Sequence, residues 1–314
     1  MFSSEQIPFG PLAVTRLKNN VTGEYADIIP GYGATLNALV LRNKDGHLLP
    51  LVDGSPDYDY LLGPGTSAYK GCVLFPFPNR IADGKYSFKG TDFQFEINHP
   101  AENNALHGTH YTAPFIIKDL QIFSDEVQLL LVHEGDGSEA WPFSYRLEVG
   151  YILGKSGLSS TLRVTNIGDS GMPIGLGIHP YFSLGETIDT LQYSMSAGHE
   201  LGVDARLIPN GTETVAEIYN RTDLSTLNFD TCFRTVPGNE KSWVNLYSSG
   251  LDTTLHVWME TRGEHYLQVY TPPGRKTIAI EPMTCAPDAF NNKKGLVVLE
   301  RGEVLALTYG VNLQ

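Results

Sequence analysis

Residues Leu158–Thr165 read LSSTLRVT, a stretch in which apolar and polar side chains alternate. In an extended chain, Leu158, Leu162 and Val164 share one face, whereas Arg163 lies among polar residues on the other. One apolar face and one wet face are typical of a half-buried strand in an antiparallel sheet. The stretch therefore predicts such a strand.

The same period of two returns elsewhere in the chain, at Tyr145–Tyr151 and at Leu305–Tyr309. Short turn-forming sequences separate stretches of this kind. We expect turns at residues 43–46, 89–91 and 210–211. The pattern contains no long amphipathic helix, and a short helix is expected only near Pro56–Leu62.

Many short antiparallel strands in one uninterrupted chain predict the fold class. Across its 314 residues the sequence has no internal repeat, no low-complexity tract and no linker-like change in composition. All-β folds of this length often form one unit. We therefore expect an all-β protein, a large antiparallel β-sandwich, with a single domain that covers residues 1–314.

The charge balance and the cysteine usage limit the partners and the compartment. The net charge is −13, so the surface repels phosphate backbones and anionic lipids, and we expect neither a nucleic-acid nor a membrane partner. No apolar run approaches the ~18 residues of a membrane span, and the N-terminal sequence lacks the features of a secretory signal. The three cysteines are scattered and include no CxxC pair, which favours a reducing compartment. The sequence thus predicts a soluble cytoplasmic protein.

Two segments contain residues that could bind a ligand or a metal, Arg80 and His107. Arg80 follows two prolines within Phe75–Gly84, and a semi-buried arginine with five donors suits a hydroxyl-rich or anionic ligand. A structural arginine paired with a buried carboxylate explains it equally well.

His107 and His110, three residues apart, raise the question of a metal site. No further ligand motif accompanies them, and we predict no metal.

Two further segments contain candidate residues of a functional site, His179 and Glu281. His179 lies between glycines and aromatic residues in Gly175–Phe182, as in the wall of a sugar pocket, although a hydrogen-bonded core histidine would give the same sequence. Glu281 follows an apolar stretch, and Pro282 is expected to end the strand there. A partly desolvated carboxylate at that position has a raised pKa and is a usable base near neutrality. The alternative is a glutamate that simply faces solvent.

In their order and spacing, several segments resemble motifs of the aldose 1-epimerase (galactose mutarotase) family. The matching segments are PNRIADGKYSFKGTDFQFEIN from Pro78, NALHG from Asn104, GIHPYFSL from Gly177, HYLQVYT from His265 and IEPMTCAPDAFN from Ile280. The resemblance extends from about Phe75 to the C-terminus. It implies the β-supersandwich fold of that family and a small-molecule sugar substrate, with no cofactor and no metal.

The resemblance also implies a role for each matching residue. Glu281 corresponds to the general base, His179 to the general acid and His107 to the second histidine of the active site. The sugar-binding residues are, by the same comparison, Asn79, Arg80, Asp230 and Gln268.

Two departures from the family pattern leave the identity of the sugar open. Ser183 stands where the family usually has asparagine, and Pro282 stands where galactose-specific members usually have threonine. A hexose, a pentose, the reducing end of an oligosaccharide and a charged sugar all remain alternatives. A monomer and a homodimer are both compatible with the sequence.

The reaction that the resemblance implies is the exchange of sugar anomers. Glu281 would take the proton of the C1 hydroxyl while His179, as an imidazolium, protonates the ring oxygen. We expect a bell-shaped pH profile whose alkaline limb reports His179, with its pKa raised by the Glu281 carboxylate. Two alternatives remain on the same sandwich: a glycoside hydrolase that uses Glu281 and Asp230, and a non-catalytic carbohydrate-binding protein.

Overall fold

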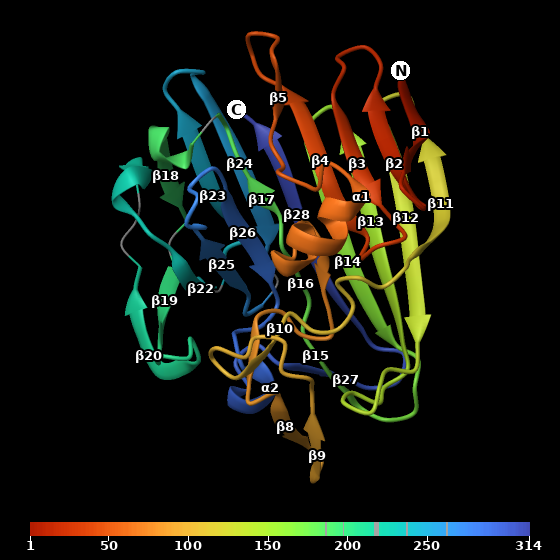
Figure 1. The fold of residues 1–314 in the computed structure, drawn as a ribbon, viewed down its shortest axis with the longest axis vertical. Helices are drawn as coiled ribbons and strands as arrows, with labels where there is room; N and C mark the ends of the chain where they lie inside the picture. Colours follow the sequence, from red (N-terminus) through yellow and green to blue (C-terminus); the bar gives the residue numbers. More distant parts are fainter. Residues whose placement is uncertain (186, 197, 217–219, 237, 262) are drawn as a thin grey trace.

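The computed structural model describes residues 1–185, 187–196, 198–216, 220–236, 238–261 and 263–314. Its named strands pair antiparallel, as the alternating sequence pattern predicts (Figure 1). A nine-stranded sheet contains, in spatial order, β11 (Ile116–Ile122), β12 (Glu126–Gly135), β13 (Tyr145–Gly154), β14 (Gly157–Asn166), β28 (Val304–Leu313), β24 (Thr253–Glu260), β23 (Lys241–Ser248), β18 (Leu191–Met195) and β21 (Thr222–Asp223). An eight-stranded sheet contains β20 (Pro209–Val215), β19 (Gly198–Val203), β22 (Asp230–Thr235), β25 (Tyr266–Tyr270), β26 (Ile278–Met283), β16 (Gly177–Ile178) and β6 (Val73–Leu74), with β17 (Tyr181–Phe182) also paired to β26.

Smaller sheets and short helices complete the fold. A five-stranded sheet is formed by β1 (Phe2–Phe9), β2 (Leu12–Asn19), β3 (Tyr25–Ile29), β4 (Thr35–Arg42) and β5 (Leu48–Pro50). The two-stranded pairs are β7 (Arg80–Ala82) with β10 (Asn104–Leu106), β8 (Lys85–Phe88) with β9 (Thr91–Gln94), and β15 (Met172–Ile174) with β27 (Val297–Leu299). The helical segments are α1 (Tyr58–Tyr60), η1 (Leu61–Gly65), η2 (Ile188–Thr190), η3 (Leu224–Thr226) and α2 (Ala289–Asn292).

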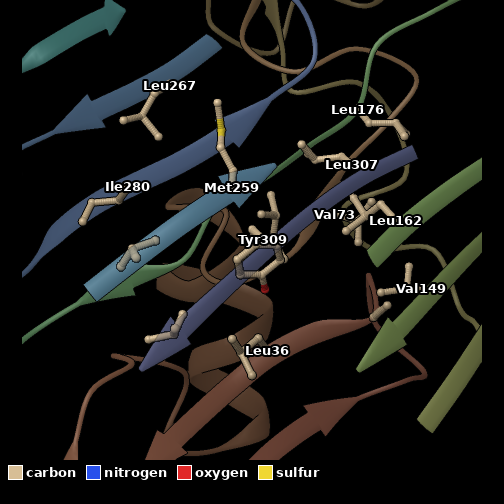
Figure 2. Close-up of a cluster of buried hydrophobic side chains, with 14 of the residues drawn as sticks. Leu36, Val73, Val149, Leu162, Leu176, Met259, Leu267, Ile280, Leu307 and Tyr309 are labelled. Atoms are coloured by element: carbon tan, nitrogen blue, oxygen red, sulfur yellow. The ribbon is translucent and has the colours of Figure 1, made fainter. Parts of the chain in front are cut away.

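The large sheets are layered as a sandwich. The five-stranded sheet packs on the nine-stranded sheet, with β1 and β2 against β11, β12 and β13 and with β4 against β28. The eight-stranded sheet approaches the same layer through β26, which contacts β28. Side chains from all three sheets meet in one buried cluster, which includes Leu36 of β4, Val149 of β13, Leu307 of β28 and Ile280 of β26 (Figure 2). The predicted all-β sandwich is confirmed.

The three stretches with alternating polarity are all strands of the nine-stranded sheet. Leu162 of β14 lies opposite Val149 of β13 on one side and Leu307 of β28 on the other. These cross-strand neighbours point to the same face and are buried together, because side chains directly opposite one another share a face. The period of two therefore predicted both the secondary structure and the buried face.

The turn predictions were correct in two cases and wrong in the third. Residues 43–46 connect β4 to β5, and residues 89–91 connect β8 to β9. Asn210 and Gly211 instead lie inside β20, where Val203 pairs with Pro209 and Leu201 pairs with Glu213. One residue of β19 thus faces three of β20, which makes the segment a β-bulge. The positive φ of Gly211 (89°), which the sequence associates with a turn, serves this bulge.

The short helix expected near Pro56–Leu62 is confirmed. Asp57 is the N-cap of α1, and its side chain accepts a hydrogen bond from the Tyr60 N–H over 2.8 Å. The helical path continues into η1, and the chain then returns to β6.

Strand β26 is buried on both faces, which explains its continuous apolar sequence. Pro282 lies within this strand and does not end it, contrary to the prediction. The Ile280 N–H points away from β25 and donates to the Pro180 carbonyl. Residue 282, two positions further on, directs its nitrogen to the same side, so the proline interrupts no bond to β25.

In the part of the chain that the structure describes, no helix has the length and apolar character needed to cross a membrane.

Candidate functional site

A cavity of about 490 Å³ opens beside the eight-stranded sheet, and all seven residues predicted for the site line it. They are Asn79, Arg80, His107, His179, Asp230, Gln268 and Glu281. His110 does not line the cavity, because its Nε2 is hydrogen-bonded to the Tyr145 hydroxyl. The structure thus brings together residues that lie up to two hundred positions apart in the sequence.

Strand β26 positions Glu281 beside His179. β16 pairs with β26 at Met283, and β17 pairs with it at Ala279, so the chain between β16 and β17 passes directly alongside Glu281. His179 lies in this short connection, and its Nε2 is 3.3 Å from Glu281 Oε1. Both residues are buried, with exposed fractions of 4% for His179 and 2% for Glu281.

Burial shifts the pKa values of this pair in opposite directions. It raises the pKa of Glu281 well above its ordinary value; Asp230 adds to that increase and Arg80 opposes it. Burial lowers the pKa of His179 to about 4. The increase for Glu281 agrees with the sequence-based expectation. The decrease for His179 differs from it, because loss of solvent disfavours the charged imidazolium.

The two pKa shifts together define the protonation state of the pair. Between the low pKa of His179 and the raised pKa of Glu281, the pair holds one proton. Burial of both groups favours the form in which this proton lies on Glu281 and His179 is neutral. Transfer of the proton across the 3.3 Å contact would give the alternative form, a carboxylate beside an imidazolium, with the same total charge. A pair of this kind is equipped for general acid–base catalysis.

His107 lies beside the pair, with its ring centroid 5.0 Å from that of His179, and its backbone is held by Asn79. Both residues have left-handed backbone conformations, with φ of 60° for His107 and 59° for Asn79. They flank the β7–β10 pair, in which Arg80 lies opposite Leu106. The His107 N–H donates to the Asn79 carbonyl (2.7 Å), and the Asn79 N–H donates to His107 Nδ1 (3.2 Å).

The contact with Asn79 determines the tautomer of His107. A backbone N–H can only donate, so Nδ1 must be the acceptor, and a neutral ring then carries its hydrogen on Nε2. Burial lowers the pKa of His107 well below its ordinary value, and the nearby His179 and Arg80 lower it further. His107 therefore offers an N–H donor from Nε2.

Four polar side chains form a closed ring of hydrogen bonds and an ion pair. Arg80 donates to Asn79 Oδ1 (3.0 Å), Asn79 donates to Gln268 Oε1 (3.1 Å), and Gln268 donates to Asp230 Oδ1 (2.8 Å). The ring closes where Asp230 Oδ2 lies 3.7 Å from the Arg80 guanidinium. Gln268 lies directly opposite Glu281 in the β25–β26 ladder, which places the ring next to the acid–base pair.

Asp288 supports this ring from behind. Its N–H donates to the Arg80 carbonyl (2.6 Å), and its Oδ1 accepts from the Ala82 N–H (3.0 Å), so it holds both ends of β7. Asp288 belongs to one of the segments that carry the family resemblance, but no local pattern indicates this supporting contact.

Several polar atoms of the site are buried and have no hydrogen-bond partner within the described ranges. They are Arg80 Nε, His179 Nδ1 and Glu281 Oε2. Buried polar groups in proteins are normally paired, so groups of this kind in a cavity suit a ligand rich in donors and acceptors. A sugar has this chemistry.

Aromatic side chains add apolar surface to the site. The Tyr181 ring stacks on the ring of His179 with centroids 5.0 Å apart, and the Tyr69 ring meets His107 edge-on at 4.6 Å. Tyr181 follows His179 by two positions and is one of the aromatic residues that the sequence analysis noted in Gly175–Phe182, whereas Tyr69 was not predicted. Tyr69, together with its neighbour Lys70, follows a loop in which no local pattern distinguishes it.

The donor set of the cavity also bears on metal binding. His107, His179 and Glu281 present ligand atoms that all lie within 4.8 Å of one another. Two imidazoles and a carboxylate are a set that first-row divalent metals accept. This set differs from the pair His107 and His110 that raised the question of a metal in the sequence, and the absence of a metal stays a prediction.

Comparisons with known proteins agree with the fold and with the motifs. The family model described as aldose 1-epimerase matches residues 15–312. An uncharacterized Escherichia coli K12 protein, YihR, is 30% identical over 253 residues, which cover 78% of this chain and 79% of YihR. Galactose mutarotase of Rattus norvegicus is 29% identical over 210 residues, which cover 66% of this chain but only 59% of the rat protein.

Solved structures extend the likeness in fold. A galactose mutarotase-like protein from Clostridium acetobutylicum superimposes with a TM-score of 0.86 at 20% identity, covering 100% of this chain and 98% of that one. A galactose 1-epimerase from Lactobacillus acidophilus gives a TM-score of 0.83 at 17% identity, with coverage of 100% and 99%. The family model spans nearly the whole chain and the fold is the same, so this protein belongs to the aldose 1-epimerase family.

Proposed function

We propose that this protein is an aldose 1-epimerase, an isomerase that interconverts the α and β anomers of a free aldose. The observation that carries the proposal is the buried contact of 3.3 Å between His179 Nε2 and Glu281 Oε1. A carboxyl group and an imidazole in contact, inside a cavity lined by hydroxyl-binding groups, supply what ring opening and closure require.

The reaction needs two proton transfers and no other reactant. One group removes the proton of the C1 hydroxyl while the other protonates the ring oxygen, and the bond between C1 and the ring oxygen breaks to give the aldehyde. Rotation about the C1–C2 bond then exposes the other face of the carbonyl, and the reverse transfers close the ring. The pair acts as base and acid in its carboxylate–imidazolium form, which arises when the shared proton moves from Glu281 to His179 across their contact. Glu281 is then the base and His179 the acid in the opening step, and they exchange roles on closure.

The remaining polar residues bind the sugar. His107 donates from Nε2, and Arg80 donates from its guanidinium. Asp230, held by Gln268 and Arg80, accepts from sugar hydroxyls. Because these groups are buried or partly buried, a sugar that lacks the matching hydroxyl leaves them unpaired and is discriminated against.

The compartment and the domain organisation belong to the same proposal. We infer a cytoplasmic protein, supported by three buried cysteines that are free thiols. We also infer that residues 1–314 act as one domain, because the main buried cluster contains Phe2 of β1 as well as Val311 of β28.

An anomer-exchange screen tests the function directly. Freshly dissolved pure anomers of a panel of aldoses are followed by polarimetry, or exchange between anomeric protons is measured by NMR at equilibrium. The proposal predicts exchange faster than the spontaneous rate for at least one aldose of the panel, neutral or charged, with no glycosidic bond cleaved in parallel assays. Hydrolysis of a glycoside, or sugar binding without any exchange, would favour the alternatives.

A further inference from the structure

A second polar pair lines the cavity apart from the seven residues already described. Lys70 Nζ lies 2.6 Å from Asp53 Oδ2, and both residues contribute to the wall of the cavity that contains Glu281. The Lys70 side chain is only 11% exposed, whereas that of Asp53 is 43% exposed. A nearly buried ammonium ion in the wall of a sugar pocket requires an explanation, because desolvation of a charge is unfavourable.

The backbone places this pair next to the acid–base residues. The two residues lie at opposite ends of the segment that leaves β5 and returns to β6. The Asp53 N–H donates to the Tyr181 carbonyl (3.0 Å), and the N–H of Gly71, which follows Lys70, donates to the His179 carbonyl (2.8 Å). The backbone at both residues is therefore anchored to the segment that runs from His179 into β17.

The ion pair is not needed to close this segment. The backbone bonds to His179 and Tyr181 already hold both ends. At the Asp53 end, Asn37 makes two further hydrogen bonds with the backbone of Ser55, one to its N–H (2.8 Å) and one to its carbonyl (3.0 Å). Lys70 Nζ also lies 5.1 Å from the centroid of the Tyr60 ring, a cation–π contact that stabilises the ammonium group. Neither this contact nor the ion pair uses all three N–H donors, and the place of Lys70 in the cavity wall makes the remaining donors accessible to a ligand.

We propose that Lys70 and Asp53 form a second hydroxyl-binding subsite, which recognises neighbouring ring hydroxyls of a neutral aldose away from the anomeric carbon. An ammonium group has three donors, of which Asp53 uses one, and the carboxylate keeps lone pairs free. Side by side they offer one donor and one acceptor to adjacent hydroxyls, each of which can accept and donate. An anionic substituent would be attracted by Lys70 and repelled by Asp53, so the pair favours an uncharged sugar.

The test compares each variant with wild type on an aldose and on its monodeoxy analogues, using the anomer-exchange assay. The variants are Lys70→Met, which keeps the aliphatic stem, and Asp53→Asn, which keeps the shape. For the aldose we expect KM to rise ~10- to 100-fold, as for loss of a hydrogen bond to a charged group, with a smaller change in kcat. Wild type should turn over one or two of the deoxy analogues less well than the aldose, because these lack a hydroxyl that the pair binds. The variants should no longer distinguish these analogues from the aldose, but should still discriminate against analogues that lack a hydroxyl at another ring position.

The control is an exposed ion pair far from the cavity, Lys44 with Asp252. Lys44→Met and Asp252→Asn should leave KM and the discrimination against every deoxy analogue unchanged. If Lys70→Met and Asp53→Asn behave like these controls, the subsite proposal is wrong. A wild-type preference for anionic aldoses that disappears in Lys70→Met would also overturn it.

The subsite rests on the proposed function for its kinetic readout, so binding is measured separately by calorimetry with the same sugars. If wild type catalyses no exchange but Lys70→Met weakens the binding of the neutral sugar, the subsite stands and the proposed function fails. If exchange is catalysed and the variants bind every sugar like wild type, the function stands and the subsite fails. Thermal unfolding identifies a misfolded variant, and Asp53→Asn then carries the test as the milder change.

Discussion

His107 and Asn79 hold each other through two hydrogen bonds, one from the His107 N–H to the Asn79 carbonyl (2.7 Å) and one from the Asn79 N–H to His107 Nδ1 (3.2 Å). The second bond decides the chemistry of the imidazole, because Nδ1 is occupied as an acceptor and the ring is neutral. His107 is therefore equipped to donate a hydrogen bond from Nε2 and not to exchange protons with the substrate.

Two substitutions of His107 separate these roles. Glutamine can place its amide nitrogen near the position of Nε2 and keep a donor toward the cavity, whereas asparagine can replace only the acceptor at Nδ1. We expect kcat/KM of His107→Gln to exceed that of His107→Asn by about tenfold, the cost of leaving a buried polar partner unpaired. Steady-state anomer exchange gives the comparison.

The tautomer itself can be observed without activity. Nitrogen-15 NMR of the histidine side chains should show His107 neutral with its hydrogen on Nε2 at neutral pH and above, since burial lowers its pKa. Titration of His107 near neutrality, or equal activity of the two variants, would contradict the donor role.

The fold could be predicted where local pattern and tertiary environment agree. β14 alternates because one face is buried against neighbouring strands, so the period of two identified it. Asn210 and Gly211 predicted a turn but form part of a β-bulge. The positive φ of the glycine is compatible with either structure, and only the pairing with β19 decides between them.

The candidate site was predictable only in part for the same reason. His179 and Glu281 lie in distinctive motifs. Lys70 and Asp53 reach the cavity because their segment bonds to the backbone around His179, and nothing in the local sequence encodes such a contact. The sign of the pKa shift of His179 also depends on complete burial, which the motif does not reveal.

Glu281→Gln tests the acid–base pair. The substitution keeps the size and hydrogen-bonding capacity of the side chain but removes the group that exchanges a proton. We expect kcat to fall by ~10²- to 10⁴-fold, with sugar binding retained. Anomer exchange and calorimetry on the same preparation provide the two readouts, and exchange near the wild-type rate would show that Glu281 is not the base.

Exhaustive chelation tests the metal-free mechanism. His107, His179 and Glu281 could hold a divalent ion, but the proposed reaction uses only proton transfer. We expect full anomer-exchange activity after treatment with EDTA and removal of the chelator, with no bound metal found by elemental analysis. Loss of activity on chelation and its recovery with one particular divalent metal would require a different mechanism.

The pH dependence of kcat/KM follows from the opposite pKa shifts of Glu281 and His179. The active form holds one proton on the pair. Activity should therefore rise as pH increases through the pKa of His179, about 4, when the doubly protonated form loses a proton. It should fall at the raised pKa of Glu281, when the last proton leaves. The result is a broad bell whose acid limb belongs to His179, the reverse of the assignment expected from sequence.

Substitutions assign the two limbs. His179→Asn should lower the rate and remove the acid limb, because no imidazole remains to be protonated, while the alkaline limb persists. Glu281→Gln should remove the alkaline limb from its residual activity. His107→Asn serves as the control and should lower the rate without changing either limb, since its ring stays neutral. If His179→Asn instead removes the alkaline limb, an imidazolium is the group that titrates there, and the carboxylate beside it must raise the pKa of His179 by more than burial lowers it.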